Sequence, residues 1–389
     1  MIFSNKIEES LTLKFSQAAN ERRKMGLPII SLGLGEPDFD VPAPFIEAVV
    51  DVLRSSTSKY SDPMGIPLLR ERISTKLSFE NNIKCAPENI VVTAGAKQAF
   101  ELICMSLLEP GDEVIIINPS FVSYIPQVFI AEPNSKVKVI DIDKKDFSID
   151  SDLIRSAVSK RTKLIVTNSP NNPTGYVLKE SFLSELFKLS QEYGFYIISD
   201  EVYEKLIFSD SSHFSIGSFE NEPERVITVN GFSKSHSMTG WRLGYACFPK
   251  SLKTKVLKLQ QHINTNTCTF IQEAVAKAFN CDQQYLIDYN ARLRERVKII
   301  THWLSGMKNV SFIEPEAGFF VFMNVGSTGI DSNTFCSELI VQKGVAATPG
   351  IAFGASWDDH VRISYAVAED NLIKGMTLIK QYLENSVQI

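Results

Sequence analysis

The chain reads Val229-Asn230-Gly231-Phe232-Ser233-Lys234-Ser235-His236-Ser237-Met238-Thr239-Gly240-Trp241-Arg242-Leu243-Gly244-Tyr245 at the end of an apolar run typical of a β-strand. Lys234 lies among small residues, and Arg242 follows eight positions later. A lysine forms an imine with a carbonyl compound only where a partly desolvated pocket favours its neutral amine. We therefore predict that Lys234 is a Schiff-base lysine and that Arg242 binds a phosphate beside it. The alternative is a solvated loop lysine.

Four other apolar runs also end in polar residues. They are residues 90–93 before Ala94-Gly95-Ala96-Lys97, 114–117 before Asn118-Pro119-Ser120-Phe121, 164–167 before Asn168-Ser169-Pro170-Asn171-Asn172-Pro173-Thr174-Gly175, and 195–199 before Asp200-Glu201-Val202-Tyr203. Short apolar runs separated by helical patterns indicate a mostly parallel sheet that is covered on both faces. Ligands bind beyond the carboxyl ends of such strands. The sequence thus predicts an α/β fold in which five strand ends face one crevice.

These fragments resemble a known family, the fold-type I, pyridoxal-phosphate-dependent aminotransferases of the aspartate aminotransferase superfamily, class I and II. The resemblance covers nearly the whole chain. It includes Leu34-Gly35-Glu36-Pro37-Asp38-Phe39, Tyr60, Ser169-Pro170-Asn171-Asn172-Pro173-Thr174-Gly175, Ser199-Asp200-Glu201-Val202-Tyr203-Glu204, the Lys234 segment and Val361-Arg362-Ile363-Ser364-Tyr365-Ala366.

The resemblance implies two domains. A large pyridoxal-phosphate-binding domain, residues 45–282, is expected to hold a mostly parallel seven-stranded sheet covered by helices. A smaller α+β domain is expected to combine residues 1–44 and 283–389, with a charged helix around residues 289–296 and strands at 318–323 and 361–365.

Length and composition are those of a soluble globular protein. The 389 residues suit a large domain with a smaller one, and 44% hydrophobic and 22% charged residues are ordinary values. A formal net charge of −5 and a pI near 5.7 do not indicate the excess of positive charge that binding to nucleic acid or to a membrane surface requires. We expect neither partner, and we interpret Arg22-Arg23-Lys24 as the solvated end of a helix.

The six cysteines are scattered along the chain. They form no Cys-x-x-Cys pair and lie near no histidine at ligand spacing, so we predict no metal site and expect reduced thiols. Residues 1–9 lack the apolar core of a signal peptide, and the most apolar stretch, 318–325, is too short to span a bilayer. We expect a cytoplasmic protein.

The resemblance assigns the residues around the cofactor ring. Pyridoxal 5'-phosphate acts as an electron sink only while its ring nitrogen is protonated, and Asp200 is expected to hold that proton. The alternative for Asp200 is a helix N-cap. Tyr203 and Asn172 would donate hydrogen bonds to the phenolic oxygen. Phe121 would stack on the ring, where aspartate-specific members usually carry tryptophan, and this departure weakens a claim of narrow specificity.

The phosphate needs donors and positive charge. Arg242 offers a bidentate fork, Ser233 a hydroxyl, and Ala96 and Lys97 the backbone N–H groups of a helix start. Tyr60 resembles the tyrosine that reaches the phosphate of the neighbouring subunit. The resemblance therefore implies a homodimer with shared active sites.

The resemblance also assigns the substrate contacts. Arg362 would bind the α-carboxylate, with the backbone of Gly35 and the amide of Asn172 completing the contact. Lys97 would bind a side-chain carboxylate, assisted by Ser10 and Thr12 before the first helix, for which plain capping chemistry is the alternative.

The predicted activity is transfer of an amino group between an L-amino acid and a 2-oxo acid, with aspartate and 2-oxoglutarate as the first choice. The alternatives are an aromatic, alanine or broad-range aminotransferase, or a β-lyase. A non-catalytic ligand-binding homologue would be expected to carry an added DNA-binding domain, for which 389 residues leave no room.

Overall fold

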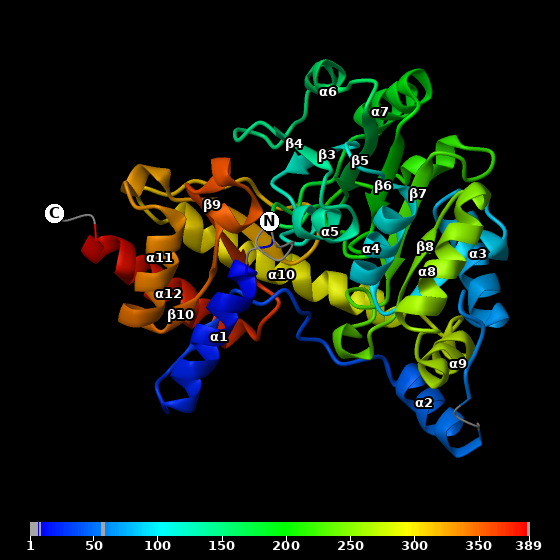
Figure 1. The fold of residues 1–389 in the computed structure, drawn as a ribbon. Coiled ribbons are helices and arrows are strands. Elements are labelled where there is room, and N and C mark those ends of the chain that lie inside the picture. The colour runs from blue at the N-terminus through cyan, green and yellow to red at the C-terminus, as the bar shows by residue number, and fades with distance from the viewer. Residues whose placement is uncertain (1–6, 8, 56–58, 387–389) are drawn as a thin grey trace.

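The structure is a computed structural model that describes residue 7 and residues 9–55 and 59–386. Most of residues 1–9, for which we expect no signal peptide, lies outside these ranges. Figure 1 shows the central sheet with its helices on one side of the molecule and β9, β10, α11 and α12 grouped on the other, with the long helix α10 running between them.

The central sheet has seven strands in the order β2-β8-β7-β6-β5-β3-β4. They are β2 (Ile90–Thr93), β3 (Glu113–Asn118), β4 (Lys136–Asp141), β5 (Thr162–Asn168), β6 (Tyr196–Asp200), β7 (Val226–Gly231) and β8 (Gly244–Cys247). All neighbouring strands pair in parallel except β8, which is antiparallel to both β2 and β7. The predicted mostly parallel, seven-stranded sheet is confirmed.

The continuous apolar runs are explained by helices on both faces of the sheet. Val114 and Ile116 of β3 pack in one core cluster with Phe100, whereas Ile115 between them packs in another cluster with Leu186. Alternate side chains of a strand point to opposite faces, so neither face tolerates polar residues here. The surrounding helices are α2 (Ala43–Ser55), α3 (Pro67–Glu80), α4 (Ala96–Leu107), α5 (Tyr124–Ala131), α6 (Ser151–Ala157), α7 (Glu180–Tyr193), α8 (Lys253–Ile263) and α9 (Thr269–Ala278).

A second structural group combines the two ends of the chain. A three-stranded sheet in the order β11-β12-β9 consists of β9 (Phe320–Asn324), β11 (Thr348–Pro349) and β12 (His360–Ser364). It packs with α1 (Leu11–Lys24), α10 (Gln284–Ser305), α11 (Ser332–Glu338) and α12 (Glu369–Ser386). β1 (Ile30–Ser31) pairs in parallel with β10 (Val345–Ala346). The N-terminal segment thus packs with the C-terminal part, and the division at residues 45 and 282 stays a prediction.

Three boundaries differ from those expected. The strand predicted at 318–323 begins at Phe320, because Gly318 has a positive φ of 73° that forms a turn. The helix predicted around 289–296 extends over all of α10. Thr12 lies inside α1 and only Ser10 precedes the helix, whereas Arg22, Arg23 and Lys24 form its last turn as expected.

No helix within the described residues combines the length and apolar character that a membrane crossing requires.

Candidate active site

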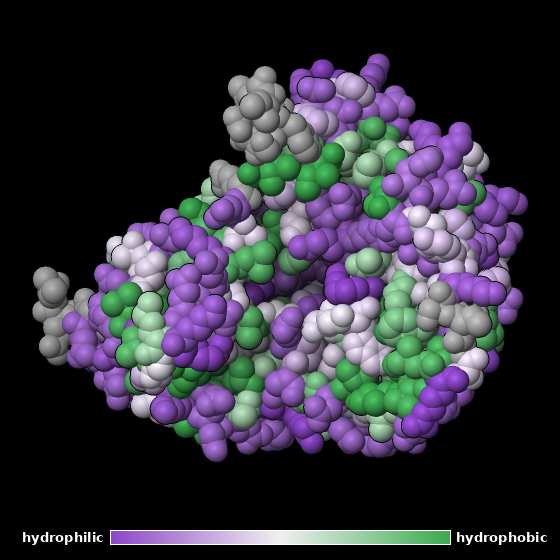
Figure 2. Space-filling view, turned by 60° about the horizontal axis from the view of Figure 1, so that its bottom comes forward, coloured by the Kyte–Doolittle hydropathy of each residue, from purple (hydrophilic) through white to green (hydrophobic). Residues whose placement is uncertain are grey.

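The carboxyl ends of β2, β3, β5, β6 and β7 open into one cavity of about 640 Å³. Figure 2 shows the molecule hollowed near its centre, with hydrophilic residues around the opening. Almost all the predicted site residues line this cavity, namely Gly35, Ala96, Lys97, Phe121, Asn172, Asp200, Tyr203, Ser233, Lys234, Arg242 and Arg362, together with Ser10 and Thr12. The volume is ordinary for a small-molecule site.

Tyr60 is the exception. Its side chain is 87% exposed and does not line the cavity of its own chain.

Lys234 follows β7 and enters the cavity with a buried amine. Its Nζ donates a hydrogen bond to the carbonyl oxygen of Gly35 at 2.5 Å. Burial lowers the pKa of Lys234 to about 8, with Arg362 and Arg242 adding to the shift and Glu36 and Asp200 opposing it. The neutral amine that a nucleophile or a base requires is therefore formed more readily near physiological pH than in an ordinary lysine.

Asp200 is the last residue of β6, and its carboxyl group is buried. Burial raises the pKa of Asp200 to about 6, although hydrogen bonds from Tyr124 and from the backbone of Val202 oppose the shift. No helix follows this residue, because a turn begins directly after it. The alternative that Asp200 is a helix cap is therefore wrong.

Tyr124 is a cavity residue that the sequence analysis missed. Its hydroxyl donates to Oδ2 of Asp200 at 2.6 Å, and its side chain is almost fully buried. The two residues lie 76 positions apart, so no local pattern indicates that they meet.

The start of α4 offers unpaired backbone donors and nearby cations. Gly95 precedes the helix with a positive φ of 87° and has no side chain to cap it. A Cβ on Gly95 would meet Arg242 Nη2 at 2.5 Å, and one on Gly244 would meet the backbone nitrogen of Ala96 at 2.4 Å. These glycines let the guanidinium and the N–H groups of the helix start lie close together, which suits an anion.

Lys97 faces the cavity from the first turn of α4. Its Nζ lies 5.5 Å from the centre of the Phe121 ring and forms no ion pair among the described residues. Burial and the nearby charge of Arg242 lower the pKa of Lys97, with Glu101 opposing them.

Arg362 lies on β12 at the opposite side of the cavity. It donates to Asn172 Oδ1 at 2.9 Å and to the carbonyl oxygen of Gly33 at 2.7 Å. Its guanidinium carbon lies 4.2 Å from the centre of the Phe320 ring and 5.1 Å from that of Phe353. Burial lowers the pKa of Arg362 to about 10, so the group stays charged at neutral pH.

Tyr203, Ser10 and Thr12 also line the cavity. Tyr203 is buried against Phe319 and Phe320, and burial raises its pKa. Ser10 and Thr12 share a hydrogen bond of 2.8 Å, and Ser10 makes no side-chain cap bond. The simple capping alternative is therefore not realised by Ser10.

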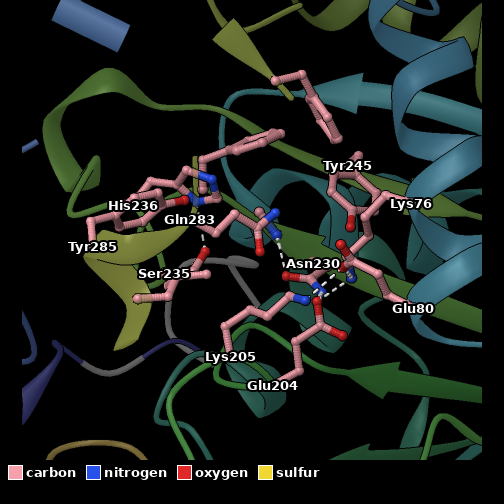
Figure 3. Close-up of a pocket in the computed structure, with 14 residues that line it drawn as sticks. Lys76, Glu80, Glu204, Lys205, Asn230, Ser235, His236, Tyr245, Gln283 and Tyr285 are labelled. Atoms are coloured by element: carbon pink, nitrogen blue, oxygen red, sulfur yellow. Dashed lines mark hydrogen bonds and ion pairs between the residues drawn. The ribbon is translucent and has the colours of Figure 1, made fainter. Parts of the chain in front are cut away.

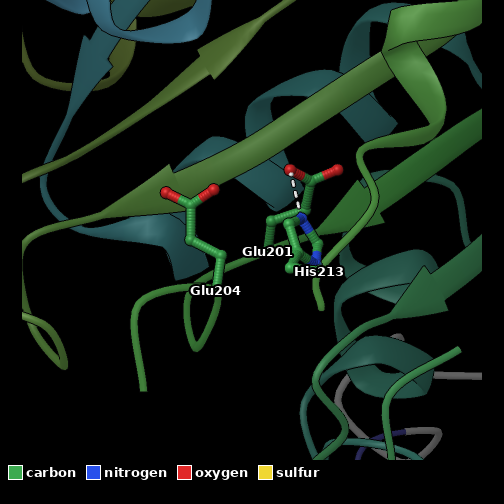
Figure 4. A group of neighbouring side chains, drawn as sticks. All are labelled: Glu201, Glu204 and His213. Atoms are coloured by element: carbon green, nitrogen blue, oxygen red, sulfur yellow. Dashed lines mark hydrogen bonds and ion pairs between the residues drawn. The ribbon is translucent and has the colours of Figure 1, made fainter. Parts of the chain in front are cut away.

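A second buried polar group lies at the same end of β6. Figure 4 shows Glu201 facing His213, with a hydrogen bond of 3.1 Å, and Glu204 beside them. Lys76 forms an ion pair with Glu204. Figure 3 shows this pair at a small cavity of about 40 Å³, which also has Lys205, Asn230 and His236 in its wall. Within this cluster, Lys76 opposes the charge of Glu204, and His213 opposes that of Glu201 when the imidazole is protonated.

Comparison with known proteins shows the family to which the chain belongs. The family model for aminotransferase class I and II matches residues 28–377. The chain belongs to the class I and II aminotransferase family. An aspartate aminotransferase of Thermotoga maritima is 38% identical over 382 residues, which cover 98% of each chain. A solved structure of an aspartate aminotransferase from Thermotoga maritima superposes with a TM-score of 0.92, at 37% identity, and covers 99% of this chain and 100% of that one.

A second solved structure bears on specificity. It is an aromatic aminotransferase from Pyrococcus horikoshii, which is 36% identical with a TM-score of 0.89 and covers 94% of this chain and 99% of its own. Class I and II aminotransferases depend on pyridoxal phosphate and convert amino acids and 2-oxo acids. The cavity fits that cofactor, because it combines a buried amine, a buried carboxylate and an anion site.

Proposed function

We propose that this aminotransferase transfers an amino group between aspartate and 2-oxoglutarate. The observation that carries the proposal is the pair of cations in the cavity, since neither Arg362 nor Lys97 has a carboxylate partner among the described residues. A dicarboxylic substrate brings two carboxylates, and each cation could bind one of them. The name of the relative from Thermotoga maritima supports the same substrate.

The proposal assigns cofactor contacts to residues that line the cavity. Lys234 would attach pyridoxal phosphate, Asp200 would hold the proton of the ring nitrogen, and Phe121 would cover the ring. Tyr203 and Asn172 would contact the phenolic oxygen. Ser233, Arg242 and the backbone of Ala96 and Lys97 would bind the phosphate. The bound cofactor withdraws electrons from the substrate, which makes the Cα proton acidic.

The protein's own part in the reaction is positioning and proton transfer. Arg362 would fix the α-carboxylate, because its guanidinium is already held by Asn172, Gly33 and two phenyl rings. The amine of Lys234 would remove the proton from the substrate Cα as a base and would deliver it, as an acid, to the C4′ carbon of the cofactor. One amino acid leaves as a 2-oxo acid, and a second 2-oxo acid then accepts the amino group.

An aromatic amino acid is the second candidate substrate. Phe121 leaves room where tryptophan would narrow the pocket, and the relative from Pyrococcus horikoshii is named an aromatic aminotransferase. Kinetic assays distinguish the aspartate proposal from the aromatic alternative. The amino donors are aspartate, glutamate, alanine, phenylalanine and tyrosine, each with 2-oxoglutarate as the acceptor, and the reaction is followed at the absorbance bands of the cofactor. The proposal requires the highest kcat/KM with aspartate, and a higher value with an aromatic amino acid would overturn it.

We also propose that two copies pair and share their active sites. The support is an apolar row on the outer face of α2, where Ile46, Val50 and Leu53 are 47%, 40% and 55% exposed. Exposed Tyr60 follows this helix in the chain and could contact the cofactor phosphate of the other copy. Cytoplasmic location stays a prediction.

A further inference from the structure

The hydrogen bond between Tyr124 and Asp200 joins two elements of the cavity wall. Tyr124 is the first residue of α5, and Asp200 is the last residue of β6. The hydroxyl of Tyr124 lies 2.6 Å from Asp200 Oδ2, and both side chains are buried. A contact this short between a hydroxyl and a carboxylate is typical of a charge-assisted hydrogen bond.

Both partners are held by their own neighbours. The ring of Tyr124 packs against Phe100 and Phe121, with centroids 4.9 Å and 5.6 Å away. The other carboxylate oxygen of Asp200, Oδ1, accepts from the backbone N–H of Val202 at 3.2 Å. Neither group can turn away without loss of packing or of a buried hydrogen bond, so the geometry is fixed before any ligand binds.

Near neutral pH, Tyr124 is the donor and Asp200 is the acceptor of this hydrogen bond. Burial and the charge of Asp200 raise the pKa of Tyr124 well above its ordinary value, so the phenol keeps its proton and donates. A donor to a carboxylate favours the ionised form, whereas burial of Asp200 favours the neutral form. The other titratable groups that face Asp200 are Glu201, Tyr203 and Lys234.

We propose that Tyr124 is a positioning residue for transamination, which keeps Asp200 ionised and oriented in the cavity. The proposal rests on the proposed function, because Asp200 is useful as an ionised group only if it holds a protonated ring nitrogen. Tyr124 itself would act through Asp200.

The test compares Tyr124→Phe with Tyr365→Phe. Tyr365 is also fully buried, but its hydroxyl has no hydrogen-bond partner in the described part of the chain, so its loss is a matched control. Cofactor-free protein is labelled with 13C at the aspartate carboxyl carbons, and the Asp200 resonance is assigned from its absence in Asp200→Asn. We expect Tyr124→Phe to raise the titration midpoint of Asp200 by about one to two pH units and Tyr365→Phe to leave it unchanged.

A second readout uses the protein with its cofactor. The acid limb of the kcat profile should move to higher pH in Tyr124→Phe, with the KM for the amino acid little changed, because the substrate contacts remain. If Tyr124→Phe does not fold, fluorotyrosine at position 124 replaces it. The more acidic phenol is a stronger donor and should lower the Asp200 midpoint.

The outcomes separate the two proposals. An Asp200 midpoint that is the same in Tyr124→Phe or fluorotyrosine protein as in the wild type would overturn the role of Tyr124, whatever the activity. If the Asp200 midpoint rises in Tyr124→Phe as expected but the wild-type protein does not bind pyridoxal phosphate, the proposed function would be overturned instead.

Discussion

At the scale of single residues, the site contains cations that form no ion pair with the described part of the chain. Lys97 is the clearest case, because its ammonium group faces the cavity without an ion pair among the described residues. Desolvation and the nearby charge of Arg242 lower its pKa, and a carboxylate of a ligand would supply the opposite charge. We therefore expect Lys97 to determine the preference for dicarboxylic substrates.

Lys97→Ala should reduce kcat/KM for aspartate and glutamate by about one to two decades, because only dicarboxylic substrates lose a charge-assisted contact of about 1.5–3 kcal/mol. The kcat/KM for an aromatic or neutral amino acid should change little. Lys255→Ala, an exposed position on α8, is the control. Steady-state kinetics with both substrate classes check the prediction, and an equal loss for all substrates would assign Lys97 to the cofactor phosphate instead.

Lys234 should carry the cofactor covalently, because its amine is buried and its pKa is lowered to about 8. Borohydride reduction followed by peptide mapping should label Lys234 and no other lysine. The Lys234→Ala variant should lose the label and about two to four decades of activity, since it lacks the catalytic base. Lys97→Ala should retain the label, and labelling of a different lysine would contradict the assignment.

Several residues of the candidate site could be predicted from the sequence, because each lies at or just beyond the end of an apolar run that forms a strand. They are Lys97, Phe121, Asn172, Asp200 and Lys234. Asp200 and Lys234 are examples, since strand ends of a parallel sheet meet at one edge. Tyr124 could not be predicted in the same way. Its role depends on a contact between α5 and β6 that no local spacing records.

At the scale of elements, the turn after β6 is held by a buried charge cluster. Glu201 accepts from Ser199, Ser215 and His213, and Glu204 is paired with Lys76. The pKa of Glu204 is lowered to about 2, because Lys76, His213 and hydrogen bonds outweigh its burial. This cluster fixes the chain between Asp200 and Tyr203, both of which face the active site.

His213 should make the stability of this cluster depend on pH. Burial lowers the pKa of His213, but the charges of Glu201 and Glu204 outweigh burial and the repulsion from Lys76, and the net pKa is raised above 6.5. The folded state therefore binds a proton more tightly than the unfolded state does. Its stabilisation is fully present below about pH 6.5 and is lost as the pH rises through the raised value.

His213→Gln should consequently lower the free energy of unfolding by about 1.5–3 kcal/mol at pH 6 and by clearly less at pH 9. Urea denaturation at the two pH values measures the difference, and His262→Gln, at an exposed position of α8, is the control. Equal destabilisation at both pH values would mean that His213 is neutral in the folded protein.

At the scale of the whole molecule, the fold leaves an apolar face that it does not cover. The inner face of α2 packs through Phe45, Ala48 and Val52, so the exposed row Ile46, Val50 and Leu53 is a second face of the same helix. The sequence alone could not separate the two faces, because nearly every turn of this helix is apolar. The difference appears only when α2 is packed against the rest of the chain.

Val50→Lys should therefore dissociate the proposed dimer, because it places a charge in the apolar contact. Analytical ultracentrifugation should show two copies for the wild type and one for the variant, with loss of activity from the shared sites. Leu153→Lys, on an exposed part of α6, should leave the assembly intact. A wild-type protein that sediments as a monomer would refute the pairing.

Arg362 and the carbonyl of Gly35 that accepts from Lys234 come from opposite ends of the chain. Arg362 lies on β12 near the C-terminus, whereas Gly35 lies shortly after β1. During synthesis on the ribosome, Lys234, Asp200 and the anion site at α4 emerge first, and the strand that carries Arg362 emerges among the last residues. The residues proposed to hold the cofactor are therefore synthesised before Arg362, the residue proposed to bind the α-carboxylate of the substrate.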